Sequence, residues 1–240
     1  MILSYSKNFL YIKTQKTGGT SLEVCLSKYC STNDIITPIQ KMNKTNESEN
    51  LRKKISNLSC QNYIVWRKPF KFLNFYKIKK YYRYSIIDRI TKNYFYNHMP
   101  LCDVKKLIKP TTFKNLFKFT FVRHPFDQFL SLYLWANEHN EKKISLEEFT
   151  TKNVENFFNI QKKNLFFNNK VNFDKVFRYE EIDISIKYLK KIFHFDDLIS
   201  DMNNIKLLKI KKNYSKKDYF NKKIENMIYK ESKIIFEKFY

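Results

Sequence analysis

Short apolar runs alternate along this chain with stretches whose apolar residues recur at helical spacing. Three runs rich in Phe, Tyr, Ile, Leu and Val predict buried strands, at 8–14, 116–122 and 173–178. Four stretches predict amphipathic helices, near 20–29, 101–108, 124–139 and 181–194. Because strands and helices alternate, the pattern predicts an α/β fold in which a parallel sheet has helices on both faces.

The remaining pattern indicates a single domain. The 240 residues suffice for one well-filled core and are few for two, and no internal repeat interrupts them. Ser145-Leu146-Glu147-Glu148 has the form of a capping box and predicts another short helix. Residues 41–57, rich in Asn, Lys, Ser and Glu, predict a surface excursion rather than a linker. We therefore expect one domain over 1–240, with a basic, aromatic-rich insertion at about 40–95.

Membrane and secretory signals are weak in this sequence. No apolar run approaches the roughly 20 residues that a membrane helix needs, and residues 1–7 lack the charged start of a signal peptide. The four cysteines form no C-x-x-C pair, at Cys25, Cys30, Cys60 and Cys102. Reduced thiols, no metal site, and a soluble, cytoplasmic protein without a transmembrane segment are the expectations.

The formal net charge of +23 has two interpretations. Only six of the 46 basic residues are arginine and there is one alanine, whereas Lys, Asn, Ile, Phe and Tyr abound, as the codons of an AT-rich genome would favour. Much of the lysine excess can therefore reflect composition bias on a solvated surface. A field this positive would also attract phosphate, sulfate or acidic glycans, so the charge alone does not decide between the two.

Both glycines of the chain stand side by side, Gly18 and Gly19, between a predicted strand and a predicted helix. An average protein holds about 7% glycine, so a pair retained in one loop indicates a backbone requirement such as close approach to a ligand. An ordinary turn is the alternative. A loop at a helix N-terminus presents free N–H groups to an anion, and Lys16, Thr20 and Ser21 could add charge and hydroxyl donors. The lysine precedes the glycines, so this is not a Walker A loop.

A second candidate site follows the strand at 116–122. Arg123 stands at its end, Pro125 suits the first turn of the next helix, and Ser131 lies two turns further on. Arg123 and Ser131 could hold a second phosphate together. The alternative makes Arg123 the ion-pair partner of Asp127.

Together these motifs resemble the sulfotransferases that use 3′-phosphoadenosine 5′-phosphosulfate (PAPS), and most closely the carbohydrate-type, or family 2, enzymes. The resemblance rests on Lys16-Thr17-Gly18-Gly19-Thr20-Ser21 and on Arg123-His124-Pro125-Phe126-Asp127 with Ser131. It implies a P-loop-like PAPS sulfotransferase fold. It also implies that residues 16–21 hold the 5′-phosphosulfate and that Arg123 and Ser131 hold the 3′-phosphate. Gln15 and Gln128 depart from the family's usual proline and arginine.

Further segments resemble the family in chain order, leaving a weak stretch from about 40 to 93. They are the histidine segment 96–100, residues 161–165, the segment 173–180 ending in Arg-Tyr-Glu, and the tail 219–240. By this resemblance His98 is the general base and Lys16 stabilises the leaving group, so that a sulfuryl group passes in line from PAPS to an acceptor hydroxyl without a metal. A glycan or another hydroxylated molecule, neutral or anionic, is the implied acceptor.

Residues 63–96 interleave basic and aromatic side chains and leave three interpretations open. Such a pattern can bind nucleic acid, it can bind sugars, or it can be an insertion whose aromatics pack inward. The competing function for the whole chain is therefore a basic nucleic-acid-binding or nucleotide-binding protein without transfer activity. Strong salt-dependent nucleic-acid affinity would favour it over the sulfotransferase.

Overall fold

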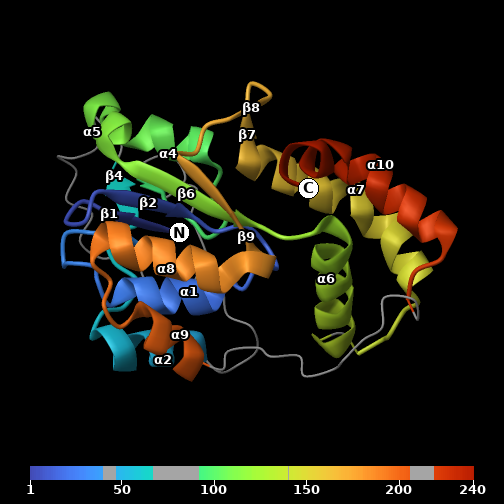
Figure 1. The fold of residues 1–240 in the computed structure, drawn as a ribbon, viewed down its shortest axis with the longest axis horizontal. Helices are drawn as coiled ribbons and strands as arrows, with labels where there is room; N and C mark the ends of the chain where they lie inside the picture. The colour runs from blue at the N-terminus through green and yellow to red at the C-terminus, as the bar shows by residue number, and fades with distance from the viewer. Residues whose placement is uncertain (40–46, 67–91, 140, 206–218) are drawn as a thin grey trace.

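A computed structural model describes residues 1–39, 47–66, 92–139, 141–205 and 219–240 of the chain. Its centre is a five-stranded sheet with the strand order β3-β1-β2-β6-β9 (Figure 1). The strands are β1 (Ile2–Ser4), β2 (Phe9–Ile12), β3 (Ile35–Ile36), β6 (Phe117–Val122) and β9 (Lys175–Arg178). The three predicted strands are thus present, each shorter than its apolar run.

The sheet is mixed, so the expectation of a parallel sheet is wrong for one half of it. β2 pairs in parallel with β6, and β6 in parallel with β9. β1 pairs antiparallel with both β2 and β3. The turn between β1 and β2 has only four residues, and a connection that short can join only antiparallel strands. Asn8 in this turn has a left-handed backbone, with φ 54°.

Helices cover both faces of the sheet, as the alternation predicted. Phe9, Tyr11 and Phe119 point to the face covered by α1 (Gly19–Ser27), α8 (Ile182–Phe193) and α9 (Leu198–Asn204). Leu10 and Ile12 point to the opposite face, under α4 (Leu101–Leu107) and α5 (Pro110–Asn115). Neighbouring residues of β2 therefore enter different cores, because successive side chains of a strand alternate between faces.

Three helices form a separate layer at one end of the sheet: α6 (Pro125–His139), α7 (Leu146–Leu165) and α10 (Lys222–Phe239) (Figure 1). Their shared core includes Phe129, Phe158 and Ile228. Pro125 is the first residue of α6, and the amide of Glu148 donates to the hydroxyl of Ser145, which caps α7. Both start signals are confirmed, but α7 has 20 residues and is not the short helix expected.

Part of the surface excursion predicted at 41–57 forms a helix that packs on the domain. Residues Glu47–Ser56 form α2, which packs against α1. Arg52 of α2 is fully buried and its guanidinium lies 3.5 Å from the carboxylate of Glu23. The polar composition of this stretch gave no sign of a buried cation, because a single inward-facing residue on a solvated helix hardly changes the pattern of polar and apolar positions.

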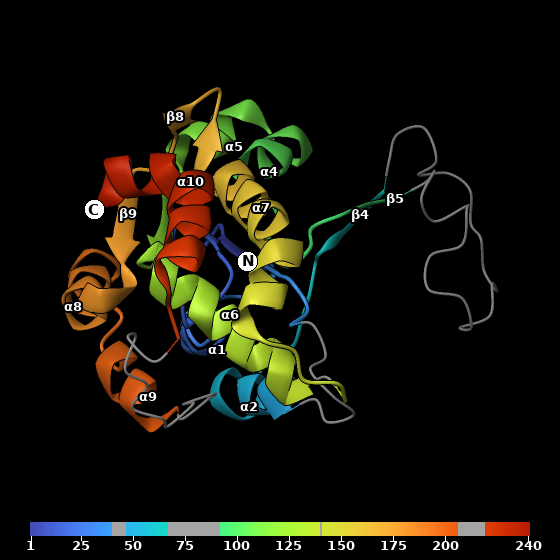
Figure 2. The ribbon, with the colours of Figure 1, turned by 90° about the vertical axis from the view of Figure 1, so that its right-hand side faces the viewer.

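Most of the basic, aromatic-rich insertion lies outside the described residues. At its edges β4 (Ile64–Trp66) pairs antiparallel with β5 (Lys92–Tyr94), and this pair extends away from the body of the protein (Figure 2). A last short pair, β7 (Phe166–Phe167) and β8 (Lys170–Val171), follows α7. In the described part of the chain, no helix combines the length and the apolarity that crossing a bilayer requires.

Candidate anion-binding site

Three loops leave the sheet at one edge and form the candidate site. Ile12 pairs with Thr120, and Val122 pairs with Arg178, in neighbouring parallel strands. The segments that follow β2, β6 and β9 therefore emerge side by side at the carboxyl ends of these strands. This is the edge at which open α/β sheets bind their ligands.

A direct contact joins the two sequence motifs. The guanidinium of Arg123, just after β6, donates from Nη1 to the carbonyl oxygen of Lys16 over 3.1 Å. Its Cζ atom also lies 4.9 Å from the ring centroid of Tyr179, the residue that follows β9. Arg123 thus spans the three loops, with a carbonyl on one side and an aromatic face on the other.

The glycine loop turns sharply before α1. Lys16 and Gly18 have left-handed backbones, with φ of 59° and 67°. Backbone turns of this kind can gather N–H groups into a concave anion-binding site. Gly18 is also the N-cap of α1, and no side chain in the described residues caps it. The first N–H groups of α1 lack intrahelical partners, as at any helix start, and the half-buried Thr20 and Ser21 lie beside them.

The protein's own side chains explain why both glycines are needed. A Cβ on Gly18 would lie 2.7 Å from Cε2 of Tyr179, and one on Gly19 would lie 2.7 Å from Cγ of Lys13. Both distances are too short for real carbon contacts. The close neighbours that the structure shows are the protein's own side chains, Tyr179 at Gly18 and Lys13 and Tyr11 at Gly19, and close approach to a ligand stays a prediction.

Lys16 lies between a cation and an aromatic ring. Its Nζ atom is 5.2 Å from the ring centroid of Trp135 on α6. Burial and the Arg123 guanidinium lower the pKa of Lys16 to about 8, and Glu138 acts in the opposite direction. The ammonium is thus partly desolvated and has incomplete charge compensation, a situation that favours an anionic ligand.

One face of α6 lies along the loop. Gln128, Ser131 and Trp135 share this face, because residues three and four apart stack on one side of a helix. Gln128 donates from Nε2 to the carbonyl of Gln15 over 2.6 Å, and Trp135 contacts Lys16. Ser131 therefore lies between two positions that touch the loop, and its expected contact with a phosphate beside Arg123 stays a prediction.

The side chain of Thr17 has an internal role. It is buried, and its hydroxyl lies 3.1 Å from the hydroxyl of Thr14 and 3.2 Å from the Thr14 carbonyl. Thr14 in turn donates to the carbonyl of Phe121 in β6. Thr17 thus fixes the loop to the sheet, and its contribution to a ligand would come from its backbone.

His98 lies at the same end of β2. Its Nδ1 atom is 2.9 Å from the carbonyl oxygen of Lys13, the residue after β2. Burial, and next the Lys13 ammonium, lower the pKa of His98 to about 4. The ring is neutral near pH 7, so Nδ1–H donates to the carbonyl and Nε2 keeps a free electron pair. The backbone of His98 is left-handed, with φ 61°.

A cluster of buried charges lies just before the glycine loop. The carboxylate of Glu23 on α1 lies 3.0 Å from Nζ of Lys13 and 2.9 Å from the Met1 amine, besides its contact with Arg52. These cations hold the pKa of Glu23 well below its usual range despite complete burial. The cluster ties α1 and α2 to the chain just before the glycine loop.

Glu180, the residue after Tyr179, has both carboxylate oxygens engaged in hydrogen bonds. One oxygen accepts from the amide of His124 over 2.7 Å, and the other accepts from the hydroxyl of Tyr240 over 2.9 Å. The ring of His124 packs edge-on against Phe236 and Tyr240. His124 and Glu180 thus connect the start of α6 to the end of α10.

Three residues of this site were not expected from the sequence: Trp135, Tyr179 as a contact of Gly18, and Glu23. Trp135 had a usable signal, since the chain has only two tryptophans and one of them follows Ser131 by a helical turn. Tyr179 belonged to a segment noted for its family resemblance, but no role followed from that. Glu23 had no signal, because an acid in the second turn of a helix is ordinarily exposed.

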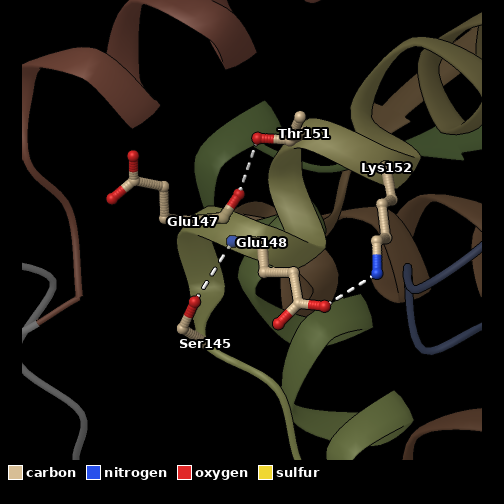
Figure 3. A pocket seen from close by; sticks show the side chains of 5 residues that line it. All are labelled: Ser145, Glu147, Glu148, Thr151 and Lys152. Carbon is tan, nitrogen blue, oxygen red and sulfur yellow. Dashed lines mark hydrogen bonds and ion pairs between the residues drawn. The ribbon is translucent and has the colours of Figure 1, made fainter.

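Two surface hollows are lined by none of the residues of this site. One of about 380 Å³ is lined by Ser145, Glu147, Glu148, Thr151 and Lys152 at the start of α7 (Figure 3). Its charged groups have partners, for example Lys152 with Glu148 over 2.7 Å, so none of them requires a ligand. No cluster of three or more His, Cys, Asp or Glu side chains suited to a metal ion occurs among the described residues.

Comparison with known proteins adds no relative. No family model, curated protein or solved structure matches this chain. The functional argument therefore rests on the residues and on their geometry.

Proposed function

We propose that this protein is a PAPS-dependent sulfotransferase that transfers a sulfuryl group to an acceptor hydroxyl, with a carbohydrate as the acceptor class. The observation that carries the proposal is the contact of Arg123 with the Lys16 carbonyl at the carboxyl edge of the sheet. It brings together the two segments that resemble the 5′-phosphosulfate and 3′-phosphate motifs, which lie 107 residues apart.

The residues at this edge suit a ligand with two anionic ends. The N-terminus of α1 and the Lys16 ammonium would hold the 5′-phosphosulfate, since helix N-termini and cations both favour negative charge. Arg123 and Ser131 would hold the 3′-phosphate, for which the guanidinium supplies a planar set of donors. Arg123 lies close enough to Lys16 to lower the pKa of the lysine. Two cations at this separation supply a physical reason to bind an anion here.

PAPS supplies an activated sulfuryl group, whose bond to the 5′-phosphate oxygen breaks as a new bond forms between sulfur and the acceptor oxygen. Lys16 stabilises the negative charge that grows on the departing phosphate oxygen. His98 accepts the acceptor's hydroxyl proton on Nε2, which the Nδ1 contact with Lys13 leaves unprotonated. A pKa of about 4 keeps this base available but below the optimum for proton transfer near pH 7. We therefore assign more of the rate to charge stabilisation and positioning than to the base.

Nucleotide binding provides the first test. Thermal unfolding would be followed with adenosine 3′,5′-bisphosphate and with adenosine 5′-monophosphate, using Lys16→Ala and Arg123→Ala as controls. A ligand at 100 times its dissociation constant adds about 2.7 kcal/mol of stability. We expect the bisphosphate to stabilise the wild type more than the monophosphate does. Arg123→Ala should lose this difference, whereas Lys16→Ala should weaken stabilisation by both nucleotides. Equal, negligible shifts with both nucleotides would contradict the proposal.

A transfer assay then separates the enzyme from a protein that only binds nucleotide. PAPS labelled in its sulfuryl group would be incubated with a panel of glycans and small hydroxylated metabolites, and label would be sought in the products. The competing nucleic-acid function predicts a different profile. It requires DNA or RNA affinity that falls steeply with salt, together with indifference to adenosine 3′,5′-bisphosphate.

A further inference from the structure

Trp135 is the aromatic residue that faces the lysine of the loop. Its ring centroid lies 5.2 Å from Nζ of Lys16, and the ring of His139 stacks on it at 5.0 Å. Trp135 is half-buried, and its indole N–H is buried without a hydrogen-bond partner in the described part of the chain. The residue therefore contributes its ring face to this site and commits no hydrogen bond elsewhere.

The charged groups around Lys16 oppose one another. Arg123, from the end of β6, disfavours the ammonium, and Glu138, one turn after Trp135 on α6, favours it. His139 is a further titratable group on this helix, and its ring stacks against the Trp135 ring. An ammonium held in this way is drawn toward the aromatic face and loses part of its hydration to the same ring.

We propose that Trp135 is a positioning residue, which holds the Lys16 ammonium beside the glycine loop and, with Glu138, sets the pH range over which Lys16 is charged. Burial against Trp135 and repulsion from Arg123 both disfavour the charged form of Lys16, whereas the Glu138 carboxylate favours it. The relevance to catalysis rests on the proposed function, because there Lys16 must be charged to stabilise the departing phosphate.

Variants of Trp135 and of Glu138 should shift the pKa of Lys16 in opposite directions, which allows a test. Lys16 acylation by acetic anhydride would be measured by mass spectrometry across a pH series, with the exposed Lys7 as the internal reference for reagent decay. Only the neutral amine reacts, so the midpoint reports the pKa of Lys16, which is about 8 in the wild type. Trp135→Ala removes the covering ring and should move the midpoint up by about 1 unit, whereas Glu138→Gln should move it down.

Two further variants control for size and folding. Trp135→Phe keeps an aromatic face and removes no hydrogen bond, so its midpoint should stay near that of the wild type. Trp135→Gln keeps a long side chain without the apolar ring and replaces Trp135→Ala if that variant does not fold, which circular dichroism would show. An unchanged midpoint in the folded alanine or glutamine variant, or a shift of Glu138→Gln in the same upward direction, would overturn the proposal.

A second readout links the position of Lys16 to ligand binding. Trp66→Phe leaves Trp135 as the only tryptophan, so its fluorescence would report adenosine 3′,5′-bisphosphate binding beside Lys16. We expect affinity to fall as pH rises through 8, and Glu138→Gln, which keeps the tryptophan reporter, to lower the pH at which it falls. The acylation result needs no nucleotide. If nucleotide binding fails while the midpoints still shift as stated, the proposed function is wrong and the positioning role of Trp135 stands.

Discussion

The guanidinium of Arg123 donates a hydrogen bond to the carbonyl oxygen of Lys16, and the two residues lie 107 positions apart in the chain. Parallel pairing of β2 with β6 creates this contact, because it brings the ends of both strands to one edge of the sheet. Both residues are cationic at a place where the adjacent helix start is positive as well. That excess of positive charge is the physical basis of the proposed anion site.

Arg123→Ala should weaken binding of adenosine 3′,5′-bisphosphate by about 1.5–3 kcal/mol, the usual value of a hydrogen bond to a charged group. Binding of adenosine 5′-phosphosulfate, which lacks the 3′-phosphate, should fall less. Isothermal titration calorimetry with both nucleotides measures the difference. Arg178→Ala is the matched control, since Arg178 is exposed and pairs with Glu181 over 3.6 Å. Equal losses for both nucleotides would remove Arg123 from the 3′-phosphate.

His98→Asn should lower turnover with the true acceptor by roughly 10²-fold, the lower end of general-base contributions, because the ring is a weak base. Asparagine tolerates the left-handed backbone of this position, so the change tests chemistry rather than strain. Nucleotide affinity should stay within about twofold of the wild type. A variant with normal turnover would show that another group takes the proton.

His98 should also make stability depend on pH. Its pKa falls from an ordinary 6.5 to about 4 on folding, so between these values the unfolded chain binds more protons. Stability therefore rises with pH across this window and is lost as pH falls from 6.5 to 4. The loss should approach about 3 kcal/mol at most. Urea unfolding at several pH values measures it, and His98→Asn should flatten this part of the curve.

Gly18→Ala should destabilise the protein by at least about 1–2 kcal/mol, the cost of a left-handed backbone for a residue with a Cβ. The added carbon would also lie 2.7 Å from Cε2 of Tyr179. Thermal unfolding of Gly18→Ala in the wild type and in a Tyr179→Ala background separates the two causes. The backbone cost should persist in the second background and the steric cost should disappear. Full tolerance of alanine would show that the loop can relax.

Glu23→Gln should destabilise the protein by about 3–5 kcal/mol, since it leaves buried cations without their counter-charge. Because the pKa of Glu23 is held below its ordinary value of 4.5, its contribution is present above that pH and is lost as pH falls through the folded pKa. Urea unfolding would compare Glu23→Gln with Lys13→Met and with the double variant. The double variant should be more stable than the sum of the two losses implies, and strict additivity would argue against the pairing.

Several features of this protein followed from the sequence because they depend on a few neighbouring residues. Pro125 starts α6 since its fixed φ suits a first helical turn, and Ser145 caps α7 since its hydroxyl reaches an amide three residues on. The strand at 117–122 followed from its aromatic and β-branched residues. The α/β class followed in turn from the order of these elements, and the pair of glycines indicated the loop.

The tertiary structure decided everything that depends on distant pairing and on burial. The antiparallel β1 has three residues, too few for its pattern to be distinguished from a loop. That Arg123 meets Lys16, that Trp135 faces the same lysine, and that Glu23 is buried among cations all depend on which strands and helices pack together. Local propensity acts within a helical turn or a strand, whereas a pKa or a close contact depends on neighbours from anywhere in the chain. The sequence by itself therefore determined the main strands and helices and the candidate residues, and the packing of the sheet decided which of these residues share a site.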